Sequence, residues 1–197
     1  RMLQAVGRRW PCIVRVASNE DVWIKKALDI GAAGVLVPLV NSPEIAARVA
    51  QACRYAPEGT RGMGLARAQR YGVGFEDYVA GANREIAAIV QAEHIEAVDR
   101  IEAIAAVPGV DAIFVGPYDL SASMGKPGQV RDPEVQTAIR RVRDAALKAG
   151  RRLGIYCSDA ESARDFVRQG FTLIGMSTDL NFLSQSAGAA LAAAKGR

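Results

Sequence analysis

Six short apolar segments alternate with longer stretches of helical periodicity along the 197 residues, and this pattern predicts an α/β protein with a parallel sheet. Such a sheet is either doubly wound or closed into a barrel. A barrel is favoured because no Gly-x-Gly-x-x-Gly turn follows an early segment, as it usually does in a dinucleotide-binding sheet. Charged residues also follow several segments, at the end where barrels carry their sites. The predicted fold is a (β/α)8 TIM barrel.

The predicted strands are short runs rich in Val, Ile and Leu, as expected of strands that are buried on both faces. In chain order they cover residues 12–16, 35–40, 88–91, 112–115, 153–156 and 172–175.

The predicted helices are amphipathic, and several begin at a Ser or Asp that can cap the helix. Glycines follow four of the expected helix ends, where a left-handed residue turns the chain toward the next strand. These glycines are Gly31, Gly109, Gly150 and Gly170. The helices cover residues 2–9, 21–30, 43–55, 95–107, 133–149 and 159–169, followed by an alanine-rich final helix around 182–194.

The organisation predicted is a single domain over residues 1–197, because half of the residues are apolar and no internal linker interrupts the chain. An eight-stranded barrel of about 250 residues needs two more strand units than this sequence supplies. Since residues 2–9 already form a helical pattern that leads into a strand, we expect the two missing units to be the first two.

Composition predicts a soluble, cytoplasmic protein. A formal charge of +4 is spread too evenly along the chain to indicate nucleic-acid binding. Cys12, Cys53 and Cys157 form no pairing motif, which favours reduced thiols over a disulfide framework or a zinc knuckle. No apolar stretch is long enough to span a membrane, and the N-terminus lacks the apolar block of a secretion signal.

Polar residues follow two neighbouring predicted strands where their carboxyl ends should meet. Gln91 and Glu93 lie on the same side of one strand, and Asp119 follows the next strand. We therefore expect the carboxylates of Glu93 and Asp119 to be neighbours. Two hard oxygen ligands suit Mg²⁺ or Mn²⁺ better than zinc, for which neither thiolates nor grouped histidines are available. Taken singly, Glu93 could instead pair with an arginine, and Asp119 could cap a helix.

Other residues are candidates for the same site, although the sequence patterns that indicate them are weaker. Arg15 ends the first predicted strand, where its guanidinium could stabilise charge developing on an oxygen or form an ordinary salt bridge. Gly116 and Pro117 form a tight turn before a helix. Backbone N–H groups at such a turn could approach a carboxylate, although ordinary loops also use this chemistry.

Three further residues have no clear assignment from pattern alone. Arg61 lies in a glycine-bearing segment that could fold over the site. Asp29 ends a helix and could orient a polar partner or cap a surface. His94, the only histidine, points away from Glu93 by strand alternation and is expected to be structural.

Several motifs together closely resemble the HpcH/HpaI aldolase family, and the resemblance covers essentially the whole chain. The most specific are Val-Gln-Ala-Glu at 90–93, Gly-Val-Asp-Ala-Ile-Phe-Val-Gly-Pro-Tyr-Asp-Leu-Ser at 109–121 and Asp-Pro-Glu-Val at 132–135. Ile-Val-Arg-Val at 13–16, Leu-Val-Pro at 36–38 and Tyr-Ala-Pro-Glu-Gly-Thr-Arg-Gly at 55–62 follow the family's order.

The resemblance implies a barrel of the phosphoenolpyruvate/pyruvate superfamily that reversibly cleaves a 4-hydroxy-2-oxo acid to pyruvate and an aldehyde. It also implies a homo-oligomer, a trimer or a hexamer, and a divalent ion, either Mg²⁺ or Mn²⁺, with Co²⁺ also possible. Carried over by position, the family's metal ligands match Glu93 and Asp119. Its substrate contacts match Arg15, Gln91, Gly116, Pro117 and Tyr118, and its catalytic residues match Arg15 and Asp29.

The sequence departs from the family at its proton-transferring histidine. The family carries this residue in an acidic-Gly-Glu-His type segment at the end of an earlier strand, and that segment is absent here. Asp29 matches the acidic partner that would orient the histidine, whereas His94 does not match the histidine itself. Two other readings of function therefore stay open: a lyase acting on a coenzyme A thioester, and a non-catalytic barrel that binds pyruvate.

Overall fold

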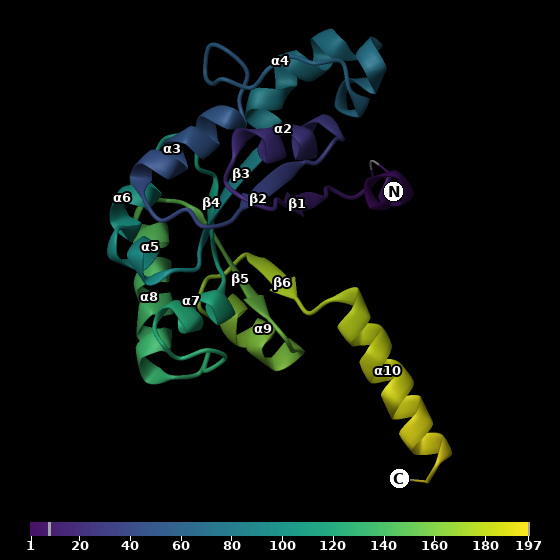
Figure 1. Ribbon diagram of the computed structural model, residues 1–197, viewed down its shortest axis with the longest axis vertical. Coiled ribbons are helices and arrows are strands. Elements are labelled where there is room, and N and C mark those ends of the chain that lie inside the picture. Colours follow the sequence, from purple (N-terminus) through teal and green to yellow (C-terminus); the bar gives the residue numbers. More distant parts are fainter. Residues whose placement is uncertain (8, 197) are drawn as a thin grey trace.

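The computed structural model describes residues 1–7 and 9–196, which form one curled sheet of six parallel strands surrounded by helices (Figure 1). The strands are paired in sequence order, from β1 at one edge to β6 at the other. Each of the six predicted strands is present. Their bounds are β1 Ile13–Arg15, β2 Gly34–Val37, β3 Ala87–Ala92, β4 Ala112–Val115, β5 Arg152–Cys157 and β6 Leu173–Met176.

Each predicted helix is present, and two further helices, Phe75–Glu85 and Pro117–Ser123, lie outside the predicted ranges. Two of the predicted helices differ most from expectation. The stretch 95–107 is two helices, because the backbone of Arg100 leaves helical geometry (φ −110°, ψ 15°). The first helix ends earlier than expected, and residue 8 of its predicted range lies outside the described residues. The helices are α1 Met2–Val6, α2 Asp21–Asp29, α3 Pro43–Ala52, α4 Phe75–Glu85, α5 Ile95–Asp99, α6 Ile101–Ala106, α7 Pro117–Ser123, α8 Pro133–Lys148, α9 Ala160–Arg168 and α10 Asp179–Ala194, with a 3-10 segment η1 at Arg67–Gly72.

Local signals at the helix ends are confirmed. The side chains of Ser42, Asp132 and Asp159 each accept a hydrogen bond from a backbone N–H in the first turn of the helix that follows. All four glycines expected in the left-handed region have positive φ: Gly31 (93°), Gly109 (84°), Gly150 (68°) and Gly170 (95°).

Both faces of the central strands are buried, which explains their uninterrupted apolar runs. Ile113 and Val115 of β4 point outward into the large core between sheet and helices. Ala112 and Phe114 point to the inner, concave face, where they pack with Ile89. A sheet whose two faces are both apolar fits a parallel barrel wall better than an amphipathic open sheet.

The inner face is filled mainly by one aromatic ring. A side chain at Gly154 would come within 2.5 Å of Phe114 Cδ2, and one at Gly175 within 3.2 Å of Phe114 Cζ. These two positions on β5 and β6 are therefore glycines because the Phe114 ring lies over them.

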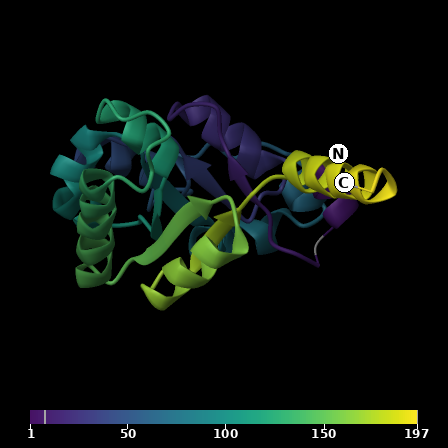
Figure 2. The same ribbon diagram turned by 90° about the horizontal axis from the view of Figure 1, so that it is seen from below.

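The last helix does not join this core. Figures 1 and 2 both show α10 extending away from the sheet, and none of its residues is buried. Leu180, Phe182, Leu183 and Leu191 on this helix are all exposed. Among the described helices, none combines the length and apolarity needed to cross a lipid bilayer.

Candidate active site at the carboxyl ends of the strands

Glu93 is the centre of a group of polar residues at the carboxyl ends of β1 to β4, which we call the carboxyl-edge site. It follows β3 directly and is only 3% exposed. Its Oε1 accepts a hydrogen bond from the backbone N–H of Leu39 (2.8 Å), and its Oε2 accepts one from Gln91 Nε2 (2.6 Å). The carboxylate is therefore fixed from two sides, by the loop after β2 and by its own strand.

Gln91 shares the inner face with Glu93 and is also buried, at 7% exposure. Because its amide nitrogen donates to Glu93, the amide oxygen is turned the other way. This oxygen, Oε1, is buried and has no hydrogen-bond partner among the described residues. A buried acceptor of this kind is normally satisfied by water or a ligand.

Gly116 leaves the space that these two side chains occupy. The strand register pairs Ala92 with Val115, which places Gly116 opposite Glu93. A Cβ atom at Gly116 would lie 2.7 Å from Gln91 Nε2 and 2.9 Å from Glu93 Cβ. Only glycine fits here, since both distances are well below van der Waals contact.

The turn after β4 presents backbone donors next to the same carboxylate. Gly116 caps α7, and Pro117 takes its first position. Backbone N–H groups in the first turn of a helix have no partner within the helix, so those of Tyr118 and Asp119 are available to a ligand. The turn therefore has the chemistry that the sequence suggested for binding a carboxylate, but α7 is too short to be a strong anion site by its dipole alone.

Burial shifts the acid–base properties of Glu93. Desolvation raises the pKa of this carboxyl above its usual value, while the hydrogen bond from the Leu39 N–H lowers it. The carboxyl of Asp119 raises the pKa further, and the guanidinium of Arg15 lowers it. Asp119 and Arg15 thus lie close enough to Glu93 to act on its charge, as expected from their positions after β4 and at the end of β1.

The two carboxylates fit a divalent oxygen-binding ion. Within the described residues, no group of three or more His, Cys, Asp or Glu side chains surrounds a possible ion position. An ion held by Glu93 and Asp119 would therefore take its other ligands from water and substrate, as Mg²⁺ and Mn²⁺ commonly do.

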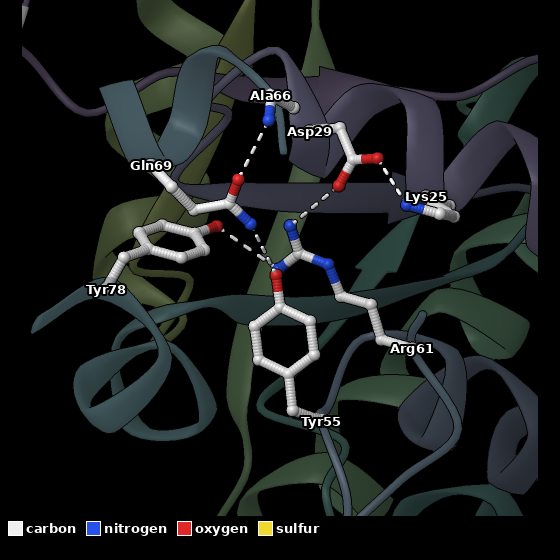
Figure 3. A network of polar contacts seen from close by, with 7 residues as sticks. All are labelled: Lys25, Asp29, Tyr55, Arg61, Ala66, Gln69 and Tyr78. Atoms are coloured by element: carbon white, nitrogen blue, oxygen red, sulfur yellow. Dashed lines mark hydrogen bonds and ion pairs between the residues drawn. The ribbon is translucent and has the colours of Figure 1, made fainter. Parts of the chain in front are cut away.

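Asp29 lies away from this group. It ends α2, the helix that leads into the amino end of β2, whereas Glu93 follows the carboxyl end of β3. Its carboxylate accepts hydrogen bonds from Lys25 Nζ and from Arg61 Nη2, the latter at 3.1 Å (Figure 3). Within this chain, Asp29 therefore anchors Arg61 and does not contact the carboxyl-edge site.

Arg61 is part of a buried network and not of a loop over the site. Its side chain is fully buried, lies 4.6 Å from the ring centroid of Tyr55, and donates a hydrogen bond to the hydroxyl of Tyr78 (Figure 3). Gln69 closes the network by donating to the Tyr55 hydroxyl at 3.2 Å. The network holds the segment between α3 and α4 against the end of α2.

His94 has a structural role, as its position in the strand suggested. Its Nδ1 accepts a hydrogen bond from the backbone N–H of Glu96, so the ring caps α5.

One contributor to the site, Leu39, could not be found from the sequence. It acts through its backbone N–H, and its left-handed conformation (φ 55°) is unusual for leucine. The side chain of Asn19 donates to the Leu39 carbonyl at 3.0 Å and supports this conformation. A backbone contact across 54 residues leaves no side-chain signal in the sequence.

Gly116→Ala tests how closely this site is packed. The added methyl group must displace Gln91 or Glu93, so we expect a loss of about 1–3 kcal/mol in the free energy of unfolding and at least tenfold weaker binding of Mn²⁺. Chemical denaturation and metal titration measure the two effects. Gly188→Ala, where a Cβ meets nothing within 4 Å, is the matched control and should leave both unchanged or raise stability slightly. Normal metal binding by Gly116→Ala would show that the close approach has no role in holding Glu93.

Comparison with known proteins places this geometry in a family. The family model described as HpcH/HpaI aldolase/citrate lyase matches residues 2–186. The hydroxypyruvate/pyruvate aldolase of Chromohalobacter salexigens is 44% identical over 189 residues, which are 94% of this chain and 74% of that protein. The 4-hydroxy-2-oxovalerate aldolase of Rhodococcus jostii is 38% identical, with 95% and 73% covered.

Solved structures agree with the sequence comparison. A HpcH/HpaI aldolase/citrate lyase family protein from Burkholderia cenocepacia superposes with a TM-score of 0.87 at 39% identity, over 93% of this chain and 73% of that one. The chain thus spans about three quarters of the length of these relatives. The chain belongs to the HpcH/HpaI aldolase/citrate lyase family, and its enzyme class is that of the carbon–carbon lyases.

Proposed function

We propose that this protein is a divalent-metal-dependent aldolase that reversibly cleaves a 4-hydroxy-2-oxo acid to pyruvate and an aldehyde. The observation that carries the proposal is the position of Glu93, a buried carboxylate held by Leu39 N–H and Gln91 beside the carboxyl of Asp119. A buried carboxylate near a second one is costly unless a cation offsets their repulsion. The aldolase names of two relatives support the same reaction class.

Glu93 and Asp119 would hold the ion, Mg²⁺ or Mn²⁺ by the hardness of their oxygen ligands and Co²⁺ as a further candidate. When bound there, a divalent ion supplies Lewis-acid polarisation of the 2-oxo group. The protein holds its part of this arrangement rigid before any ligand arrives, because both oxygens of Glu93 are already hydrogen-bonded.

The remaining edge residues bind and orient the substrate in this proposal. The backbone N–H of Tyr118, at the turn formed by Gly116 and Pro117, would bind the carboxylate of the 2-oxo acid. Gln91 Oε1, a buried acceptor without a partner, would accept a hydrogen bond from a hydroxyl of the substrate or from a bound water. The guanidinium of Arg15 would stabilise the negative charge that develops on the 2-oxo oxygen when the carbon–carbon bond breaks.

Proton transfer requires a group that these residues do not supply. We propose, from the family pattern, that Asp29 orients a histidine from outside this chain. Because Asp29 lies at the opposite end of the strands from Glu93, that histidine would serve the site of another copy in the proposed homo-oligomer. Arg61 and Lys25 keep its carboxylate fixed for that purpose. This assignment rests on the position of Asp29 in the family pattern.

We also propose that residues 1–197 belong to one (β/α)8 barrel domain that assembles as a homo-oligomer of three or six copies. The curled sheet leaves β1 and β6 each paired on one side only within the described residues, and an edge of this kind is normally paired or covered. The exposed apolar side chains of α10 support association between copies.

Loss of the Glu93 carboxylate tests the proposed reaction. Pyruvate release from a 4-hydroxy-2-oxo acid should require Mg²⁺ or Mn²⁺, stop on addition of chelator, and fall by at least about 100-fold in Glu93→Ala. The reason is that a metal ion contributes several kcal/mol to stabilising the developing charge, and each 1.36 kcal/mol corresponds to a factor of ten in rate. A coupled lactate dehydrogenase assay measures the pyruvate.

Glu96→Ala is the matched control, because Glu96 is an exposed carboxylate three residues away and should leave turnover unchanged. Metal-dependent pyruvate binding without turnover would contradict the aldolase assignment and favour a non-catalytic barrel. Turnover of a coenzyme A thioester instead would show a different lyase of the same family.

The raised pKa of Glu93 predicts how metal binding depends on pH. A divalent ion needs the ionised carboxylate, so its affinity should rise as the pH rises from the ordinary carboxyl value of 4.5 through the higher value of the folded protein. In the metal-free protein, the free energy of unfolding changes with pH in the opposite direction. Over the same window, stability is lost as the pH rises, because a buried carboxyl must ionise.

Glu93→Gln, which cannot ionise, should remove the contribution of this carboxyl to both dependences. Mn²⁺ titration and thermal melting of the metal-free protein at a series of pH values measure the two curves. A pH dependence of metal-free stability that is the same in Glu93→Gln and the unaltered protein would assign the effect to other groups.

Charge on α10 should disrupt the proposed assembly. Leu183→Glu combined with Leu191→Glu places two carboxylates on the exposed apolar helix, and we expect a shift from trimer or hexamer toward monomer in light scattering. Val22→Glu, at a 50% exposed position on α2, is the control and should keep the oligomer. An unchanged mass of the double variant would show that α10 does not hold the copies together.

A further inference from the structure

The hydrogen bond from the Leu39 N–H to Glu93 depends on a turn that leucine does not favour by itself. The N–H and the carbonyl of Leu39 lie on either side of its Cα atom, and at φ 55° the backbone directs the first to Glu93 Oε1 and the second to Asn19. The left-handed region is unfavourable for leucine. The leucine side chain is 51% exposed, so its own burial contributes little to holding this conformation. Neighbouring groups must therefore hold the turn.

Asn19, in the loop after β1, supplies such support. Backbone pairing between β1 and β2 extends to the hydrogen bond from the Val16 N–H to the Leu36 carbonyl (3.1 Å). Further along the same two segments, Asn19 Nδ2 donates to the Leu39 carbonyl at 3.0 Å. The Asn19 side chain thus continues the pairing of the two strands into the loops that follow them.

The orientation of the Asn19 amide is fixed by Arg48 on α3. Arg48 Nη2 donates to Asn19 Oδ1 at 2.7 Å and to the Asn19 carbonyl at 3.1 Å. A guanidinium only donates hydrogen bonds and a carbonyl only accepts them, so the amide oxygen of Asn19 must face Arg48 and the amide nitrogen must face Leu39. Asp21, at the start of α2, lies 3.8 Å from Arg48 Nε and pairs with it. An asparagine is therefore matched to both of its neighbours.

We propose that Asn19 is a positioning residue for the metal-binding carboxylate, because it holds the Leu39 turn whose N–H fixes Glu93. The inference rests on the proposed function, in which Glu93 is a metal ligand. Loss of the Leu39 donor would leave Gln91 Nε2 to hold the carboxylate from one side. A less fixed carboxylate binds a divalent ion more weakly, since part of its conformational freedom is then lost only when the ion binds.

Mn²⁺ titration of the metal-free protein tests this role without substrate, with unbound Mn²⁺ followed by its electron paramagnetic resonance signal. Asn19→Ala removes the donor to Leu39, and we expect about fivefold weaker Mn²⁺ binding, the effect of losing one neutral hydrogen bond. Asn181→Ala, at an exposed position on α10, is the matched control and should bind Mn²⁺ like the unaltered protein. Thermal melting shows whether each variant is folded.

Changes at Leu39 separate positioning from a general loss of structure. Glycine adopts the left-handed region without strain, so Asn19→Ala in a Leu39→Gly background should weaken Mn²⁺ binding by less than about twofold. Leu39→Val keeps every backbone hydrogen-bonding group but disfavours the left-handed region. It should weaken Mn²⁺ binding even with Asn19 present, and it provides the test if Asn19→Ala does not fold.

Unchanged Mn²⁺ affinity in folded Asn19→Ala or Leu39→Val would overturn the positioning role and leave the proposed metal site intact. Equal losses from Asn19→Ala with Leu39 present and in the Leu39→Gly background would also overturn it, because independent effects add. If the unaltered protein bound no Mn²⁺, the proposed function would be overturned and this inference with it.

Discussion

The close approach of β3 and β4 at Gly116 is the constraint on which the candidate site depends. With no side chain at this position, Gln91 and Glu93 can stand side by side on the inner face, 2.6 Å apart through their hydrogen bond. The loop after β2 then completes the arrangement through the Leu39 N–H. Three consecutive strands thus fix one carboxylate before a ligand is bound, which is the kind of preorganisation that metal-assisted chemistry uses.

On the inner face of the sheet below the site, glycines again make room for a larger side chain. Phe114 fills the inner face because Gly154 and Gly175 leave room for its ring. Tyr156 packs against this cluster, and its ring contacts the ring of Tyr118 edge to face. The aromatic contacts therefore connect the inner face of β4 to Tyr118 in the turn that follows this strand.

At the amino ends of the strands, the buried charged group is the guanidinium of Arg61. Arg61, buried between Tyr55 and Tyr78, is neutralised by Asp29 at the end of α2. A buried guanidinium needs such partners because an unpaired charge is expensive to bury. This explains why Asp29, which the family pattern associates with proton transfer, lies in a structural network within a single copy of the chain.

The sequence by itself determined the six strands, most helix ends and the residue types at the carboxyl edge, because these depend on local apolar periodicity, capping and strand alternation. It also placed Glu93 and Asp119 near one another, since parallel strands end at a common edge. Only the tertiary structure decided that Leu39 donates to Glu93, that Asp29 faces Arg61, and that Asn19 donates to the Leu39 carbonyl. Each of these depends on contacts between residues distant in the chain, often through backbone atoms, and such contacts leave no periodic pattern in the sequence.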